Sequence, residues 1–369
     1  MAKQLRISLT TTLTLLEQLQ AALSAPAGDT KPAELSGKDA LPLLSTSATA
    51  LKSQITKLSL LTITSPFTHS AVGTVLSALN GSVLPSLVTA ALLVTPTDHT
   101  KAFHAEVHAL TKTALRELTS LVTEVQAVAE KTDKAKDGQK KGGELSQAEK
   151  DTVTVATGRV WDSCDTLIDV ATKGVVGFVI QRVEEWRDLV RDAVEEIEEW
   201  DPEEDGDEFF DDLLSDDGEK DIQDEDEDTE ESSAALHAQK KSTLRILKPI
   251  AQIYPAIVAN RLKGAGDVPC SSPSGIGRLE RLMTNLQHIP EHVDEVAGAL
   301  YEEDLDKCAR YLGKVKRCAM NAVDSVKPTW DMVDAADGQQ KEDKFTIWSK
   351  TWTNVLDEVS KSVGSDNPE

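Results

Sequence analysis

The chain has 369 residues and a formal net charge of −24, and most of that charge lies in one segment. Residues 195–231 hold 23 acidic side chains and one Lys, a net charge of −22, which leaves 40 acids and 38 bases, or −2, for the rest. A nearly neutral body with one acidic arm repels phosphate backbones, which argues against a nucleic-acid partner and favours basic proteins as partners.

The first predicted element is an amphipathic helix that ends near Ala25. Its apolar side chains recur every three or four residues, at Leu5, Leu9, Leu13, Leu16, Leu19 and Leu23. Glu17, Gln18 and Gln20 interrupt the apolar run, so the segment differs from a signal peptide. No apolar stretch of the chain reads as long enough to cross a bilayer, and no membrane association is expected.

Three further helices are predicted before residue 95. A linker over 26–37 precedes a helix that ends near Ile63. Residues 65–94 are interpreted as two shorter helices, because Asn80-Gly81 suits the end of one helix and Ser82 the cap of the next.

Two long helices follow. One begins near Phe103, keeps a single apolar stripe, and ends in a Lys- and Gly-rich loop over 131–144. The other begins at the capping box "SQAE" (146–149) and is predicted to break at Gly174.

The helix after Gly174 has the most regular pattern, with two sets of side chains spaced by seven residues. The sets are Val176, Val183, Val190 and Ile197, and Val179, Trp186, Ala193 and Trp200. This spacing is typical of a dimerising coiled coil, but Ile180, Leu189 and Val194 widen the apolar face. The interpretation is therefore a bundle helix, because wide stripes face globular cores.

Helices are predicted to resume at Ser232, after the acidic segment. Pro249 and Pro255 are expected to kink or interrupt the first of them. Further helices are predicted near 275–288 and 290–302, then two more that contain the apolar stripes Leu305–Val326 and Phe345–Val359.

The fold class that follows is all-α, with two antiparallel helical bundles of the vinculin and talin kind joined by an acidic disordered linker. The predicted boundaries are 1–200 for the first bundle, 201–231 for the linker and 232–369 for the second bundle.

The search for catalytic and metal-binding patterns predicts a protein that is not an enzyme and has no metal or cofactor. His104 and His108 share one helix face, but the pattern lacks the Glu of H-E-x-x-H and a third ligand. His288 and His292 repeat the spacing across Pro290, which is expected to break the helix. The four cysteines are too sparse for a disulfide scaffold, and reduced thiols in an intracellular protein are expected: Cys164, Cys270, Cys308 and Cys318.

The acidic segment contains four bulky apolar side chains among its carboxylates, Phe209, Phe210, Leu213 and Leu214. The segment lacks the Gly and final Glu of a calcium loop and is predicted to be disordered. The apolar group is a candidate docking point for a partner protein. The alternatives are a plain spacer, or a piece that folds back on its own domain. Trp186 and Trp200, on the preceding helix, are further candidate partner contacts.

Three blocks of sequence, at 55–93, 158–200 and 289–326, resemble the family of Grap- and cyclin-D-interacting proteins. They include "TSPFTHSAVGTVLSALNGSVLPSL", "DVATKGVVGFVIQRVEEWRDLV" and "YEEDLDKCARYLGKVKRCAM". The resemblance implies an all-helical, non-enzymatic protein of nucleus and cytoplasm that binds D-type cyclins and helix-loop-helix regulators and restrains the cell cycle. It also implies a helix-loop-helix segment over 147–200 without a DNA-binding basic region. The alternative from the residues is a scaffold or adaptor of the vinculin and talin kind.

Overall fold

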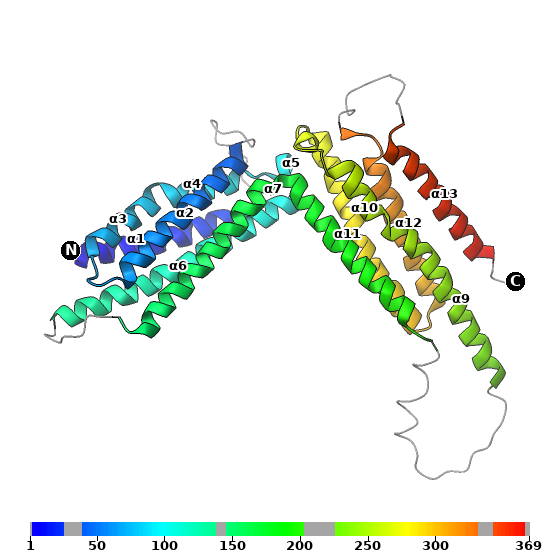
Figure 1. Ribbon diagram of the computed structural model, residues 1–369, viewed down its shortest axis with the longest axis horizontal. Helices are drawn as coiled ribbons and strands as arrows, with labels where there is room; N and C mark the ends of the chain where they lie inside the picture. The colour runs from blue at the N-terminus through cyan, green and yellow to red at the C-terminus, as the bar shows by residue number, and fades with distance from the viewer. Residues whose placement is uncertain (1, 26–38, 138–144, 203–225, 331–341, 366–369) are drawn as a thin grey trace, which may run out of the picture. The chain divides into compact units, whose positions relative to one another are not determined.

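The computed structural model describes residues 2–25, 39–137, 145–202, 226–330 and 342–365, and these are helical or in short connections, with no strand among them. The chain forms two compact units, Met1–Phe178 and Val179–Glu369 (Figure 1). The predicted all-α class with two helical bundles is confirmed.

The first unit packs α1 (Ala2–Ser24), α2 (Ala40–Ile63), α3 (His69–Ala78), α4 (Leu84–Leu93), the short α5 (Pro96–His99), α6 (Lys101–Asp137) and the first part of α7 (Gln147–Glu199). Its core consists of the predicted stripes: Leu5, Leu9, Leu16 and Leu23 of α1 are buried, as are Phe103, Val107 and Leu118 of α6. The predicted capping box is present, because Ser146 N donates to Glu149 Oε2 at 2.8 Å.

The predicted break at Asn80-Gly81 is wrong. A π-helical turn, Leu79–Val83, connects α3 directly to α4. The Ser82 hydroxyl donates back to the carbonyl of Ala78 at 3.1 Å and caps nothing. The turn buries Leu79 and Val83 and lets Asn80 Nδ2 donate to the Thr12 hydroxyl at 2.9 Å.

This continuity also corrects the expectation about apolar length. His69–Leu93 is long and apolar enough, by length and composition, to cross a bilayer. Half of its most apolar window is buried inside the protein, as in a core helix, since α3 and α4 pack on α1 and α2.

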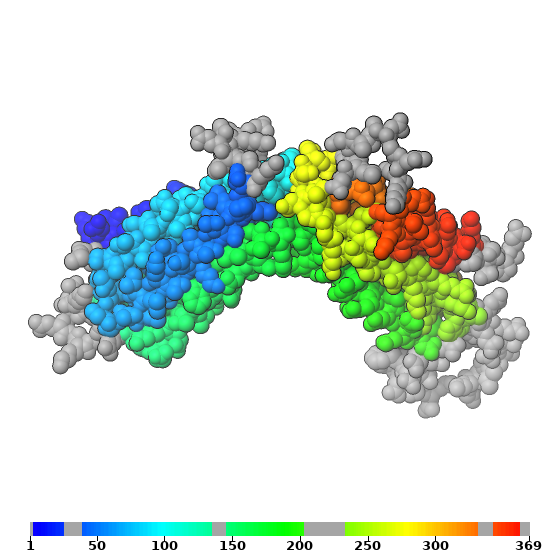
Figure 2. All heavy atoms as spheres, turned by 45° about the horizontal axis from the view of Figure 1, so that its top comes forward, coloured from blue at the N-terminus to red at the C-terminus, as the bar shows by residue number. Residues whose placement is uncertain are grey.

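The second unit packs the rest of α7 with α9 (Asp226–Ala251), α10 (Ile253–Ile257), a π-turn (Val258–Leu262), a 3₁₀ turn (Val268–Cys270), α11 (Pro273–Tyr301), α12 (Leu305–Val326) and α13 (Lys344–Ser365). Helix α13 lies on α9, and Lys316 of α12 pairs with its Asp357 at 3.0 Å. Figure 2 shows α13 (red) as an outer layer of this unit, and Ile347 on it is 53% exposed.

The division between the units differs in position from the expected boundary at residue 200. The predicted break at Gly174 is confirmed, because its φ of 66° and ψ of −172° are not helical and divide α7 into two helical segments. The side chains of Val179, Val183, Val190 and Ile197 beyond it are buried in the second unit. The expected linker 201–231 therefore falls between two helices of one unit, α7 and α9, and its predicted disorder lies outside the described residues apart from its two ends.

The prolines of the second unit behave in two ways. Pro249 and Pro255 do interrupt the helix, since α9 ends at Ala251 and α10 is short. Pro290, in contrast, lies inside the continuous α11, so the predicted division near residue 289 is wrong. Proline removes the N–H that would bond the carbonyl four residues earlier, here Leu286. The buried Tyr254 hydroxyl donates to that carbonyl at 3.1 Å and replaces the missing donor.

Two buried arginines fix the end of α12. Arg278 donates to the carbonyls of Ser325 at 3.1 Å and Thr329 at 3.1 Å, and also to Pro328. Arg261 donates to Val326 O at 2.7 Å and pairs with Asp343 at 2.7 Å, which ties the start of α13 to the same place. Carbonyls at a helix end lack intrahelical partners, and the guanidinium forks supply them.

Candidate partner-binding surface

The two tryptophans predicted as partner contacts lie on one edge of α7. The helical period places Trp186, Leu189, Ala193 and Trp200 in a single row beside the buried face. Both tryptophans are half-buried, and Leu189 is 56% exposed. Fourteen residues of helix put the two indoles about 21 Å apart along the axis. We call this row the α7 edge.

The far end of the α7 edge is an aromatic pair. Trp200 and Tyr301, the last residue of α11, stand edge to face with centroids 5.0 Å apart. The Tyr301 hydroxyl donates to Glu196 Oε1 at 3.1 Å, and its side chain is 39% exposed. Edge-to-face aromatic pairs with a polar tip at the surface are frequent in protein interfaces.

Two lysines of α9 stabilise the end of α7. Lys240 Nζ donates to the carbonyl of Glu198 at 3.1 Å and to that of Trp200. Lys248 Nζ pairs with Glu198 Oε1 at 2.8 Å. A helix C-terminus carries partial negative charge, and acids there are unfavourable without such cations.

The surface around the α7 edge is acidic. Residues 179–200 hold eight acids and three arginines, a net charge of −5. The three arginines form ion pairs with acids of the same helix; Arg191, for example, lies 3.1 Å from Asp192. Asp192, together with Asp188 and Glu195, raises the pKa of the Arg191 guanidinium. Burial, together with Glu196, Glu291 and Glu295, raises the pKa of Asp294 on the neighbouring α11. The edge thus combines apolar side chains with negative charge, a combination that suits a partner with a basic rim.

The side chains of His104 and His108 contact backbone carbonyls of the first unit. Both ring nitrogens of His108 face backbone carbonyls, Leu23 O at 3.3 Å and Ala91 O at 3.1 Å, and the neutral ring donates to one of them. His104 Nδ1 lies 2.5 Å from Val94 O. Burial lowers the pKa of His108, and nearby His104 lowers it further. The described residues hold no group of three possible metal ligands.

The thiols are also structural. All four cysteines are free, and burial raises the pKa of Cys164 to about 12 and that of Cys270 to about 11. A thiol with a raised pKa is a poor nucleophile at neutral pH.

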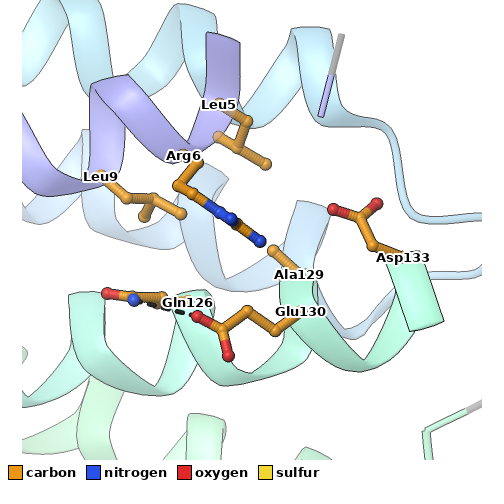
Figure 3. A pocket seen from close by; sticks show the side chains of 7 residues that line it. All are labelled: Leu5, Arg6, Leu9, Gln126, Ala129, Glu130 and Asp133. Carbon is orange, nitrogen blue, oxygen red and sulfur yellow. Dashed lines mark hydrogen bonds between the residues drawn. The ribbon is translucent and has the colours of Figure 1, made fainter. Parts of the chain in front are cut away.

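A pocket between α1 and α6 is too small for a substrate. Figure 3 shows Arg6 reaching across it toward α6, where Gln126 Nε2 donates to Glu130 Oε1 at 3.1 Å. Its volume of about 10 Å³ is that of a single water site. An open depression on the outer face of α1, lined by Thr10, Thr14 and Asn80, brings together no acid–base pair.

Two of the six predicted contact residues, Trp186 and Trp200, therefore lie on the same edge of α7 without touching one another. Phe209, Phe210, Leu213 and Leu214 lie outside the described residues. Tyr301 and Lys240 complete the α7 edge, and sequence reasoning missed both. Their positions depend on packing between distant segments, for which the chain carries no short motif.

One family model matches part of the chain. Residues 43–203 match the family described as "Grap2 and cyclin-D-interacting, N-terminal". That range runs from the start of α2 to the end of α7 and contains both Trp186 and Trp200. No curated protein matches the chain. Residues 43–203 are therefore similar to the N-terminal region of the Grap2 and cyclin-D-interacting family.

Proposed function

We propose that this protein is a non-enzymatic interaction protein that binds a cyclin of the D type, helix-loop-helix regulators, or both, and restrains cell-cycle progression in the nucleus and cytoplasm. The observation that carries the proposal is the α7 edge, which lies inside the family-matched range and ends where the acidic segment begins. Tryptophan and tyrosine, here Trp186, Trp200 and Tyr301, are among the side chains that most often dominate binding energy at interfaces. No metal, cofactor, nucleic acid or membrane is part of the proposed activity.

The acidic segment would contribute attraction and the α7 edge specific contact. Attraction between opposite charges speeds association and weakens with salt, whereas buried apolar contacts slow dissociation. If Phe209, Phe210, Leu213 and Leu214 also dock, their replacement with Ser speeds dissociation and leaves the salt dependence of association unchanged.

The decisive experiment measures the affinity of the full chain for a purified D-type cyclin. Trp186→Ala with Trp200→Ala is expected to weaken binding at least tenfold, since interface tryptophans each contribute on the order of 2 kcal/mol. The matched control is Trp161→Ala, which removes an indole that is 37% exposed on the other half of the same helix. Circular dichroism melts of all variants separate lost contact from lost folding.

Equal binding by the double variant and the native protein would exclude the α7 edge as the contact. An absence of cyclin binding, with co-sedimentation of the native chain on actin filaments, would favour the scaffold alternative. That alternative rests on the helical-bundle architecture alone, which is shared by proteins of many functions.

A further inference from the structure

Helix α12 carries positive charge on a strongly acidic protein. Its 22 residues hold five bases and two acids, whereas the chain as a whole has a net charge of −24. Arg310, Lys314 and Arg317 recur every three or four residues and so form one row. This row, which we call the α12 basic row, lies away from the buried face of the helix.

The α12 basic row is not neutralised by its neighbours. Arg310 and Arg317 are exposed, and within the described part of the chain neither they nor Lys314 forms an ion pair. Lys314 Nζ instead lies 3.9 Å from the centroid of the Tyr311 ring. The flanking bases differ, since Lys307 pairs with Glu302 at 2.9 Å and Lys316 with Asp357 at 3.0 Å.

The acidic segment leaves the second unit next to the start of α12. Residues 203–225 hold 13 acids and one Lys, a net charge of −12. They follow Trp200, whose ring is 5.0 Å from Tyr301, and α12 begins four residues later, at Leu305. Figure 1 shows the end of α7 and the start of α12 at the same end of the unit. Twenty-three residues can extend to about 75 Å, whereas the row from Arg310 to Arg317 is about 10 Å long.

We propose that the α12 basic row binds the acidic segment 203–225 of the same chain. Two nearby acids, Glu295 and Glu302, lie 3.8 and 2.9 Å from Lys307 and so pair with that lysine, not with the α12 basic row. A tethered segment acts at an effective concentration of about millimolar, which favours it over free acidic proteins. This inference does not rest on the proposed function.

The test is carbodiimide cross-linking of the full chain, which joins a lysine amine directly to a carboxylate in contact with it. Lys314 is expected to join acids within 203–225 at low salt, and at least fivefold less in 1 M NaCl, where the Debye length is about 3 Å. Arg310→Glu with Arg317→Glu is expected to reduce the product at Lys314 at least fivefold. The control is Lys57→Glu with Arg159→Glu, an equal charge change at two exposed bases of the first unit that leaves the product unchanged.

Three outcomes overturn the inference. The first is no more product at Lys314 than at the exposed Lys57. The second is undiminished product in the Arg310→Glu, Arg317→Glu variant. The third is product that joins isotope-labelled to unlabelled chains in a mixture, which would make a second copy the source of the acids.

Discussion

Tyr254 is expected to stabilise the second unit by one specific hydrogen bond, and the reason for that bond is Pro290. Both Tyr254 and Leu286 are fully buried, so the Leu286 carbonyl has no water to replace a lost donor. Burial also raises the pKa of the Tyr254 hydroxyl above its ordinary value, which favours the protonated form that donates the hydrogen bond.

Tyr254→Phe removes the donor and leaves the ring in place. A buried carbonyl without a partner costs about 1–3 kcal/mol. A unit of this size loses roughly 2–4 °C of melting temperature per kcal/mol, so a loss of several degrees is expected. The matched control is Tyr301→Phe, which removes an exposed hydroxyl from the same unit and is expected to cost less than about 0.5 kcal/mol.

The cause is isolated by repeating Tyr254→Phe in a Pro290→Ala background. Alanine restores the backbone N–H that can bond the Leu286 carbonyl, so the hydroxyl becomes redundant. The cost of Tyr254→Phe should then fall by about 1 kcal/mol or more, a coupling that a double-mutant cycle measures.

Urea titration followed by tryptophan fluorescence suits this cycle. Five of the six tryptophans, all except Trp161, belong to the second unit, so the signal reports mainly on that unit. An equal loss of stability in both backgrounds, with coupling below about 0.3 kcal/mol, would refute the link between the hydroxyl and the proline.

Four further outcomes are expected. Arg278→Met removes donors from three carbonyls at the end of α12 and should cost at least about 2 kcal/mol in urea titration, whereas Arg281→Met, on an exposed position of the same helix, should change stability little. The hydrogen bond from Arg261 lowers the pKa of Asp343 from 3.8 to about 2, so the stability it gives is present above about pH 4 and is lost as the pH falls toward 2; in Asp343→Asn, acid melts should lack this component, and an unchanged acid profile would contradict it. Limited proteolysis should cut first between residues 201 and 231, and the two pieces should elute together in gel filtration because α7 and α9 belong to one unit; separate elution would contradict the domain division. Purified protein should contain no stoichiometric zinc or calcium by elemental analysis, and chelator should leave its melting temperature unchanged; one equivalent of zinc lost on His104→Ala would contradict this.

Helical periodicity made much of the fold predictable. Most side chains in the stripes of α1, α6 and α12 are buried as their spacing indicates, although Leu305 at the start of α12 is 37% exposed. Local signals failed where tertiary contacts outweigh them. Asn80 lies inside a π-turn held by Thr12, and Pro290 is accommodated by Tyr254, which lies 36 residues away in sequence. The sequence around Asn80 and Pro290 does not indicate that Thr12 and Tyr254 are their partners.

Only the part of the candidate surface that lies on a single helix was predictable from the sequence. The seven-residue spacing placed Trp186 and Trp200 on one edge, since that geometry belongs to a single helix. Tyr301 and Lys240 approach Trp200 from α11 and α9, and only the packing of the unit brings them there.

Helix α7 crosses the boundary between the two compact units and runs most of the way to the end of the family-matched range. The range matched by the family ends at residue 203, but the first compact unit ends at Phe178. A fragment cut at the family boundary would carry Val183, Val190 and Ile197 without the helices that cover them, and it would expose a sticky apolar face. The range that matches the family, 43–203, therefore differs from the first compact unit, which ends at Phe178. The part of α7 after Gly174 contributes Phe178 to the core of the first unit and Val183, Val190 and Ile197 to the core of the second.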